Sequence, residues 1–338
     1  MRATVLHAPG DVRVEDLPKA SLQQPTDAVI RTVATCVCGS DLWDYRGINE
    51  VAEPTPGGHE YVGIVEEVGS EVTSIKPGQL VVGSFFASDN TCPNCANGYQ
   101  TNCLHREFVG GCQAEYVRVP LADGTLVHVP GEVSEEHIPS LLACSDVMGT
   151  GWYAAVAAQV KPGDTVAVVG DGAVGLCAVI AAKELGATRI IAMSRHTSRQ
   201  QLAREFGATD VIAERGDEGV ARVKELTGGI GADAVLECVG SPESMQQALH
   251  ATRPGGNVGF VGVPHGVQID GQELFFSHAA LRGGPAPVRA FLPGLIERVL
   301  DSRINPGKVF DLELPLEKAA EGYRAMDERR AIKTLLRP

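Results

Sequence analysis

Three separated segments of the 338-residue chain carry side chains that bind metal ions. They contain Cys38, then His59 followed by Glu60, and finally Asp146. A thiolate, an imidazole and a carboxylate suit Zn²⁺, and three protein ligands leave a fourth position for water or a substrate. Each residue also has an ordinary interpretation, as a small core residue, a loop histidine or a helix N-cap. If the fold brings the segments together, the pattern predicts a catalytic zinc site.

A glycine motif predicts that the chain binds a dinucleotide. Residues 165–169 form an apolar strand-like run, which continues into G-x-G-x-x-G and then into a helix-like segment over 175–185. The glycines allow a tight turn and let a pyrophosphate approach backbone N–H groups at a helix N-terminus. The expected contacts are Gly170, Gly172, Ala173, Val174 and Gly175.

The residues after the next strand predict the form of the cofactor. An acidic residue about 20 positions beyond the glycine motif would bind the ribose 2′-hydroxyl of NAD. Here Ser194 stands 19 residues after Gly175, and Arg195 and Arg199 follow it. A hydroxyl and two guanidinium groups suit a 2′-phosphate. The sequence therefore favours NADP(H) over NAD(H).

Composition excludes several classes of partner. The chain has 29 Lys and Arg residues and 42 Asp and Glu residues, giving a formal net charge of −13. It has no stripe of basic residues, so nucleic acid is not an expected partner. Apolar stretches such as 178–182 are far too short to span a membrane. Nine cysteines, an odd number, in a chain without a recognisable signal peptide favour thiolate ligands over disulfides. We expect a cytoplasmic protein.

The positions of apolar runs predict two kinds of architecture. Residues 1–130 contain short Val-rich runs separated by Gly and Pro, as in antiparallel strands. From about 164 to 265, apolar strands such as 189–193 alternate with helix-length segments, which predicts a parallel sheet built from βαβ units. After residue 285, a helix over 288–300 leads into further helix-like and strand-like segments.

Taken in order, these motifs resemble the medium-chain zinc-dependent alcohol dehydrogenases over essentially the whole chain. The resemblance rests on Cys38-Gly39-Ser40-Asp41, Gly58-His59-Glu60, a cysteine lobe near residues 90–103, Asp146 ahead of Thr150-Gly151, and the glycine motif. It implies an α/β fold, in which a GroES-like antiparallel β catalytic domain carries an inserted Rossmann domain with a doubly wound parallel sheet. The expected domains are 1–149 (catalytic), 150–285 (Rossmann, NADP-binding) and 286–338 (return to the catalytic domain).

The resemblance assigns roles to the metal-binding segments. The implied ligands of the catalytic zinc are Cys38, His59 and Asp146. Glu60 matches a glutamate that can approach the metal, and Asp41 matches a carboxylate that orients the ligand histidine. Ser40 would take the proton of the substrate hydroxyl. The implied reaction is hydride transfer between an alcohol and nicotinamide, with zinc as the Lewis acid.

Two features depart from the family pattern. The family often has a proton-relaying histidine where this chain has Trp43, so the relay must use water, a ribose hydroxyl or another side chain. Trp43, together with Phe85, is expected to shape an apolar substrate pocket, although core packing explains Trp43 equally well.

The second departure concerns the structural zinc lobe. The family has four cysteines separated by two, two and seven residues, and here the same ladder is Asp89, Cys92, Cys95 and Cys103. Three thiolates and a carboxylate can surround a second zinc ion. The alternatives are that Cys112 replaces Asp89, that the lobe holds no metal, or that Cys92 and Cys95 form a disulfide. We expect two zinc ions per chain.

Further cofactor contacts follow from the family and from strand ends. Lys333 matches a basic residue that meets the pyrophosphate, the alternative being a solvated lysine. Nucleotides bind at the carboxyl ends of strands in open α/β sheets, so Val239, Gly240, Val261 and Val263 are expected to line the nicotinamide and ribose pocket.

The sequence thus predicts an NADP-preferring, zinc-dependent alcohol dehydrogenase or aldehyde and ketone reductase acting on small molecules. One alternative is a zinc-free quinone or enoyl reductase, which would lack the metal ligands. Another is a non-catalytic NADP-binding redox sensor, which the fold alone would permit. By analogy with the family, a strand ending near Phe275 would pair two copies, giving a homodimer or homotetramer.

Overall fold

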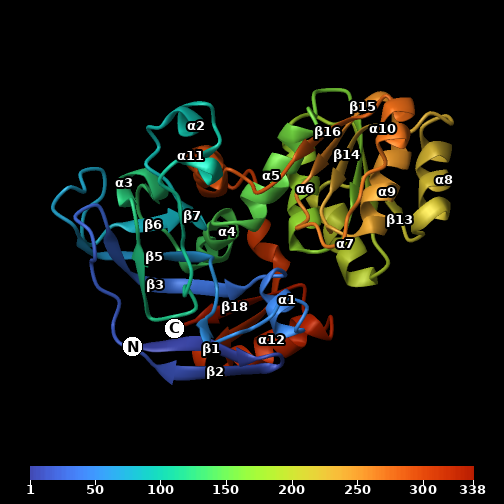
Figure 1. The fold of residues 1–338 in the computed structure, drawn as a ribbon. Coiled ribbons are helices and arrows are strands. Elements are labelled where there is room, and N and C mark those ends of the chain that lie inside the picture. The colour runs from blue at the N-terminus through green and yellow to red at the C-terminus, as the bar shows by residue number, and fades with distance from the viewer. The chain divides into compact units, whose positions relative to one another are not determined.

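The computed structural model describes residues 1–338, which divide into two compact units (Figure 1). The first unit comprises 1–146 and 287–338, and the second comprises 147–286. The boundaries expected from the sequence fall after residues 149 and 285. The second unit is therefore an insertion in the first.

The first unit is built mainly from antiparallel strands. A seven-stranded sheet has the order β10-β6-β5-β3-β18-β17, with β9 also paired to β3, and a three-stranded sheet has the order β2-β1-β4. A small β7-β8 pair completes the strands. Their bounds are β1 Arg2–Ala8, β2 Asp11–Asp16, β3 Ala28–Val37, β4 Thr55–Pro56, β5 Tyr61–Val68, β6 Leu80–Gly83, β7 Phe86–Ala87, β8 Glu107–Phe108, β9 Tyr116–Val119, β10 Leu126–His128, β17 Phe310–Pro315 and β18 Lys333–Arg337.

Short helices connect these strands. They are α1 Asp41–Tyr45, α2 Pro93–Ala96, α3 Ala122–Thr125, α4 Ile138–Cys144, α11 Val288–Leu300 and α12 Ala319–Asp327, with single turns η1 Gln100–Asn102, η2 Glu135–His137, η3 Pro306–Val309 and η4 Leu316–Lys318. The C-terminal strand β18 lies between β3 and β17, pairing antiparallel with β3 through Thr334 and Val37. This pairing places residues from the C-terminal end of the chain beside the segment that follows β3.

The second unit contains a six-stranded parallel sheet in the order β13-β12-β11-β14-β15-β16. The strands are β11 Thr165–Val169, β12 Arg189–Met193, β13 Asp210–Ile212, β14 Ala232–Glu237, β15 Thr252–Phe260 and β16 Ala280–Gly283. The helices are α5 Val147–Ala157, α6 Ala173–Glu184, α7 Thr197–Phe206, α8 Gly216–Leu226, α9 Pro242–Ala251 and α10 Gly271–Ser277. Strand order and parallel direction confirm the predicted doubly wound sheet.

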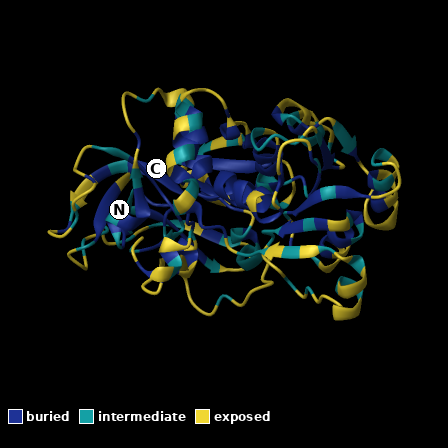
Figure 2. Cartoon of the chain, turned by 90° about the horizontal axis from the view of Figure 1, so that it is seen from above, coloured by how far each residue is buried: buried dark blue, intermediate teal, exposed yellow.

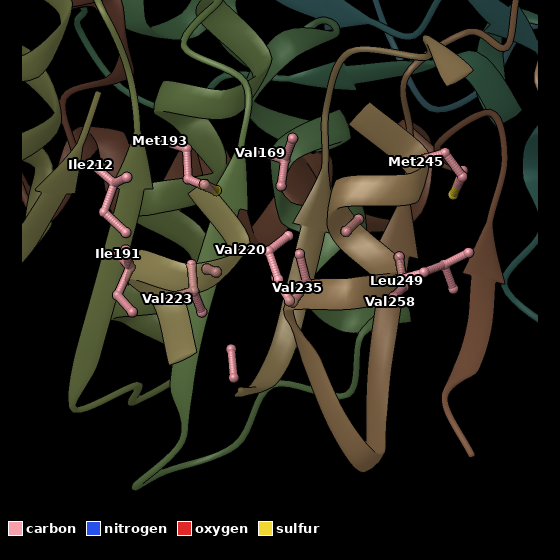
Figure 3. Packing of buried hydrophobic residues seen from close by; sticks show 14 residues of the cluster. Val169, Ile191, Met193, Ile212, Val220, Val223, Val235, Met245, Leu249 and Val258 are labelled. Atoms are coloured by element: carbon pink, nitrogen blue, oxygen red, sulfur yellow. The ribbon is translucent and has the colours of Figure 1, made fainter. Parts of the chain in front are cut away.

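The apolar strands of this sheet are buried as the sequence predicts. Val166 to Val169 of β11 are all buried, as expected for a central parallel strand covered on both faces. Figure 3 shows one of the resulting apolar clusters, in which side chains of neighbouring strands pack with those of helices α8 and α9. Helices α5 and α6 approach very closely, since a Cβ on Gly151 would lie 2.6 Å from the Ala178 nitrogen.

Exposure is concentrated in loops and on the outer faces of helices, while the sheet strands are largely buried (Figure 2). None of the helices combines the length and the apolar character that a membrane span requires.

Candidate metal centres and nucleotide-binding turn

The first unit brings the three predicted zinc ligands together. Cys38 directly follows β3, His59 lies in the loop before β5, and Asp146 follows α4. The Asp146 Oδ2 lies 3.2 Å from the His59 Nε2 and 3.9 Å from the Cys38 Sγ. Zinc bonds of about 2.0–2.3 Å give ligand separations of about 3.3–3.8 Å in a tetrahedron. One potential ligand atom from each of these residues and from Glu60 lies within 4.8 Å of the others.

A partly buried carboxylate, that of Asp41, orients the ligand histidine. The His59 Nδ1 lies 3.3 Å from the Asp41 Oδ1, so the other ring nitrogen points to Asp146. Asp41 also accepts a hydrogen bond from the Cys38 N–H at 2.9 Å. Burial lowers the pKa of His59, but the neighbouring Cys38, Asp146 and Asp41 outweigh it and hold the pKa well above its usual range. The ring therefore faces a strongly anionic set of donors.

Two buried residues that the sequence did not single out support Asp41. Gln113 donates from its Nε2 to the Asp41 Oδ2 at 3.2 Å and to the Cys36 carbonyl at 3.0 Å. The Tyr323 hydroxyl in turn donates to the Gln113 Oε1 at 3.0 Å. Gln113 and Tyr323 are 210 positions apart. No local pattern marks either residue, so only the folded chain reveals this network.

Lys333 contacts Glu60, a member of the donor set that contains Cys38, His59 and Asp146. Its side chain is 1% exposed, and its Nζ donates to the Glu60 Oε1 at 2.7 Å and to the Val37 carbonyl at 3.2 Å. Burial lowers the pKa of Lys333, but Cys36 and Glu60 outweigh that effect, so the ammonium is charged. The Lys333 ammonium is thus balanced by Glu60 and is not the solvated lysine of the alternative interpretation, while its contact with a pyrophosphate stays a prediction.

The residues at this centre fit a zinc ion. Sulfur, imidazole nitrogen and carboxylate oxygen are the donors that zinc takes, and Asp41 supplies the hydrogen-bonding support typical of a ligand histidine. The Glu60 Oε2 is buried and has no hydrogen-bond partner. A carboxylate oxygen of this kind, next to three ligands, is suited to approach a cation.

Ser40 and several aromatic rings lie next to the metal ligands. Ser40 precedes α1, and its hydroxyl forms no capping hydrogen bond, so it does not act as a helix cap. The ring of Phe85 lies edge-on to that of His59, with centroids 6.0 Å apart. Phe108, which the sequence analysis did not identify, has its centroid 5.8 Å from that of His59 and is 57% exposed. Trp43 is half-buried on α1.

The cysteine lobe forms a second compact donor set. Ligand atoms of Asp89, Cys92, Cys95 and Cys103 lie within 4.8 Å of one another. The Cys92 Sγ is 3.5 Å from that of Cys95 and 3.9 Å from that of Cys103. The Asp89 carboxylate accepts the N–H groups of Thr91 and Cys92 and lies 2.7 Å from the His105 Nδ1. Backbone N–H groups of Cys95 and Leu104 lower the pKa of Cys92 to about 7.

The structure argues against two of the alternatives for this lobe, the replacement of Asp89 by Cys112 and the disulfide. Cys112 is buried elsewhere, with its Sγ near the Val109 carbonyl, and does not belong to the donor set. All nine cysteines are free thiols, and the Cys92–Cys95 sulfur separation is much longer than the ~2.05 Å of a disulfide. Three thiolates and one carboxylate therefore fit a tetrahedral zinc site.

In the second unit, the glycine motif forms the turn between β11 and α6. Gly170 has φ +119°, and a Cβ on Gly175 would lie 2.1 Å from the Gly170 carbonyl oxygen. Gly172 is the residue before α6, so Ala173 and Val174 present N–H groups at the start of a 12-residue helix. This arrangement is suited to a pyrophosphate.

The three residues predicted to bind a 2′-phosphate differ from one another in burial and in hydrogen-bond partners. Ser194 is buried directly after β12, and its hydroxyl donates to the Asp171 Oδ2 at 2.9 Å. The Arg199 Nη1 lies 3.3 Å from the Asp171 Oδ1 and 3.3 Å from its carbonyl oxygen. Arg195 is exposed. Asp171 itself stands inside the glycine motif, where sequence analysis could have found it.

Four residues predicted to contact the cofactor lie at the ends of β14 and β15. Val239 is 42% and Val263 is 54% exposed, which is unusual for valines next to a sheet. Gly240 has φ +87°, and its carbonyl accepts the His265 N–H. These residues, with Val261, lie at the carboxyl ends of strands, where nucleotides bind in open α/β sheets.

Comparison with known proteins agrees with both units. Residues 24–131 match the alcohol dehydrogenase GroES-like domain, and residues 173–298 match the zinc-binding dehydrogenase family. Zinc-type alcohol dehydrogenase B of Aspergillus flavus is 36% identical over 100% of this chain and 81% of that protein. A probable zinc-binding alcohol dehydrogenase of Mycobacterium tuberculosis is 36% identical over 96% of this chain and 84% of that protein.

Among solved structures, the alcohol dehydrogenase TADH of Thermus sp. ATN1 has a TM-score of 0.91 and 34% identity, covering 100% of this chain and 99% of that one. The chain belongs to the medium-chain zinc-type alcohol dehydrogenase family of oxidoreductases.

Proposed function

We propose that the protein is a zinc-dependent alcohol dehydrogenase or aldehyde and ketone reductase that transfers hydride between a small-molecule substrate and a nicotinamide dinucleotide. The observation that carries the proposal is the convergence of the buried residues Cys38, His59 and Asp146 into one donor set. Ser40 lies two residues after Cys38. The family supplies the reaction class, and the donor set supplies the reason to expect the metal.

In the proposed reaction, Cys38, His59 and Asp146 would hold the catalytic zinc. When bound, zinc supplies a Lewis acid that acidifies a hydroxyl or polarises a carbonyl. The Ser40 hydroxyl, two residues from Cys38, accepts the proton of the alcohol in oxidation and returns it in reduction. From Ser40 the proton leaves through water or a ribose hydroxyl, because Trp43 cannot carry it.

The surrounding side chains keep this site in order. Asp41, fixed by Gln113, holds the His59 ring so that its Nε2 faces the metal position. Lys333 holds one oxygen of Glu60, and the other oxygen, which has no hydrogen-bond partner, would be available to a bound metal. Phe85 and Phe108 give the site an apolar wall, which favours substrates with hydrocarbon or aromatic groups.

We further propose that Asp89, Cys92, Cys95 and Cys103 bind a second, structural zinc ion, since all four positions are protein ligands and none is left open. The dinucleotide would bind at the Gly170 turn, beside Val239, Gly240, Val261 and Val263. Ser194, Arg195 and Arg199 predict NADP(H). Because Ser194 and Arg199 both contact the Asp171 carboxylate, this proposal covers NAD(H) as well as NADP(H).

The proposed setting is the cytoplasm, without nucleic-acid or membrane partners. By analogy with the family, we also propose a homodimer or homotetramer that pairs through the edge of the second unit's sheet. The predicted strand ending near Phe275 is wrong, because residues 271–277 form helix α10 and the edge strand is β16, Ala280–Gly283. Phe275 and Phe276 in this preceding helix are 73% and 69% exposed and support that edge as an interface.

The test is the initial rate of NADPH and NADH oxidation with a panel of aliphatic and aromatic aldehydes and ketones, before and after zinc removal by a strong chelator. We expect turnover that chelation abolishes and zinc restores, and Cys38→Ala and Ser40→Ala variants with at least 100-fold lower kcat/KM. Turnover that survives complete metal removal would move the protein to the zinc-free quinone or enoyl reductases. Nucleotide binding without turnover on any substrate would favour a redox sensor.

A further inference from the structure

The glycine turn of the second unit carries an acidic side chain between its first two glycines. The Asp171 side chain is 9% exposed, and each of its carboxylate oxygens has one partner. Ser194 donates to Oδ2 at 2.9 Å, and the Arg199 guanidinium lies 3.3 Å from Oδ1. Asp171 thus ties the end of β11 to the end of β12 and to helix α7.

The position of this carboxylate follows from the sheet register. Strands β11 and β12 are parallel neighbours, and their last residues, Val169 and Met193, are paired. Figure 3 shows both side chains at the same end of the sheet, away from Ile191. The residues that follow, Gly170-Asp171 on one strand and Ser194 on the other, therefore leave the sheet side by side.

The place after the second strand is where dinucleotide-binding folds read the ribose. An acidic residue there accepts the ribose 2′-hydroxyl of NAD, and a basic residue nearby accommodates the 2′-phosphate of NADP. The sequence has Ser194 at that place and no acid. In the structure a carboxylate is nevertheless present there, one hydrogen bond from Ser194, because Asp171 supplies it from the turn that follows the neighbouring strand β11.

The ion pair between Asp171 and Arg199 reduces the positive charge that a 2′-phosphate would meet. Arg199 was expected to bind the 2′-phosphate, but it is paired with Asp171 and buried to 13% exposure. Burial raises the pKa of Asp171, but Ser194, Arg199, His196 and Arg215 outweigh it, so the pKa lies below its usual range and the carboxylate is ionised at neutral pH. An ionised carboxylate repels a phosphate in a partly buried site, while its unused lone pairs can accept a hydroxyl.

We propose that Asp171 is the residue that selects the cofactor, favouring the free 2′-hydroxyl of NAD(H) and disfavouring the 2′-phosphate of NADP(H). The inference rests on the proposed function, because it requires the dinucleotide to bind at the Gly170 turn. It reverses the preference that Ser194, Arg195 and Arg199 suggest when they are considered without Asp171.

The test measures binding without turnover. Isothermal titration calorimetry of the purified protein with ADP-ribose and with 2′-phospho-ADP-ribose gives the ratio of two Kd values for ligands that differ only at the 2′ position. We expect the wild type to bind ADP-ribose at least 10-fold more tightly. The Asp171→Asn variant keeps the shape of the side chain and an acceptor for Ser194 but removes the charge, and should move the ratio at least 10-fold toward the phosphorylated ligand.

Two controls separate charge from structure. Asp164 is a buried carboxylate just before the opposite end of β11, where it accepts the Lys161 N–H, so Asp164→Asn makes the same chemical change away from the turn. It should leave the Kd ratio within twofold of the wild type. Ser194→Ala removes the hydrogen bond but keeps the Asp171 charge, and should preserve the preference for ADP-ribose.

Two results would overturn the assignment: tighter binding of 2′-phospho-ADP-ribose by the wild type, or the same ratio in Asp171→Asn as in the wild type. The first needs no variant, so the inference stays testable even if Asp171→Asn fails to fold. Failure of the wild type to bind either ligand would instead refute the dinucleotide site of the proposed function. These outcomes are distinguishable in one set of titrations.

Discussion

The buried ion pair between Lys333 and Glu60 gives the sharpest stability prediction. The two side chains are 1% and 0% exposed, the Lys333 Nζ and the Glu60 Oε1 are 2.7 Å apart, and the Glu60 Oε2 has no hydrogen-bond partner. Lys333→Met would leave the buried Glu60 carboxylate without its ion-pair partner. Removing one partner of a buried ion pair costs about 3–5 kcal/mol. We therefore expect the free energy of unfolding of the first unit to fall by about 4 kcal/mol.

That loss corresponds to a large change in melting temperature. The first unit has 146 plus 52 residues, and a unit of about 200 residues loses about 2–4 °C per kcal/mol. A loss of about 4 kcal/mol therefore predicts a Tm lower by about 8–16 °C. The assay is thermal unfolding of the chelator-treated protein, followed by the fluorescence of Trp43 in a Trp152→Phe background, because the chain's two tryptophans lie in different units.

A second variant distinguishes the buried charge from lost packing. In Lys333→Met combined with Glu60→Met both charges are absent, so most of the stability should return, since an apolar pair can replace a buried ion pair at little cost. Lys76→Met, at an exposed position of the first unit, is the matched control and should leave the Tm unchanged. A Tm loss below about 2 °C for Lys333→Met, or a double variant no more stable than the single one, would refute this reasoning.

Three further predictions concern the first unit. Asp27→Asn should destabilise it by about 3 kcal/mol at pH 7, since Asp27 is buried 2.6 Å from the Arg118 Nε. Burial raises the pKa of Asp27, but Arg118 and two backbone N–H groups outweigh burial, so the pKa lies below its usual value. Its contribution is thus present above the unfolded pKa of about 3.9 and is lost as the pH falls through the lower folded value, so urea unfolding at pH 3 should show a smaller difference than at pH 7. Asp89→Ala should lower the zinc content measured by mass spectrometry from two to one per chain, while Asp89→Cys should keep two; equal contents would remove Asp89 from the ligand set. Gln113→Leu should weaken zinc binding at the catalytic centre by about 10–100-fold in a chelator competition assay, and an unchanged affinity would refute its positioning role.

Much of the fold was predictable because apolar periodicity and turn residues are local signals. The strands over 165–169 and 189–193 and the helix over 288–300 have the bounds that the sequence predicts. The alternation of strands and helices also predicts the parallel sheet, because parallel strands need crossover connections. Register is different: the pairing of Val169 with Met193, which decides what Asp171 meets, depends on how two strands slide past each other.

The sequence by itself determined which chemistry is available: the types of metal ligands, their order, and a glycine turn that only small residues can form. Only the tertiary structure decided the partners of the charged side chains. Lys333 meets Glu60 because β18 is inserted beside β3, and Asp171 meets Ser194 because β11 and β12 end together. The physical reason is that a buried charge must find its counter-charge in space, and the nearest one in space is often remote in sequence.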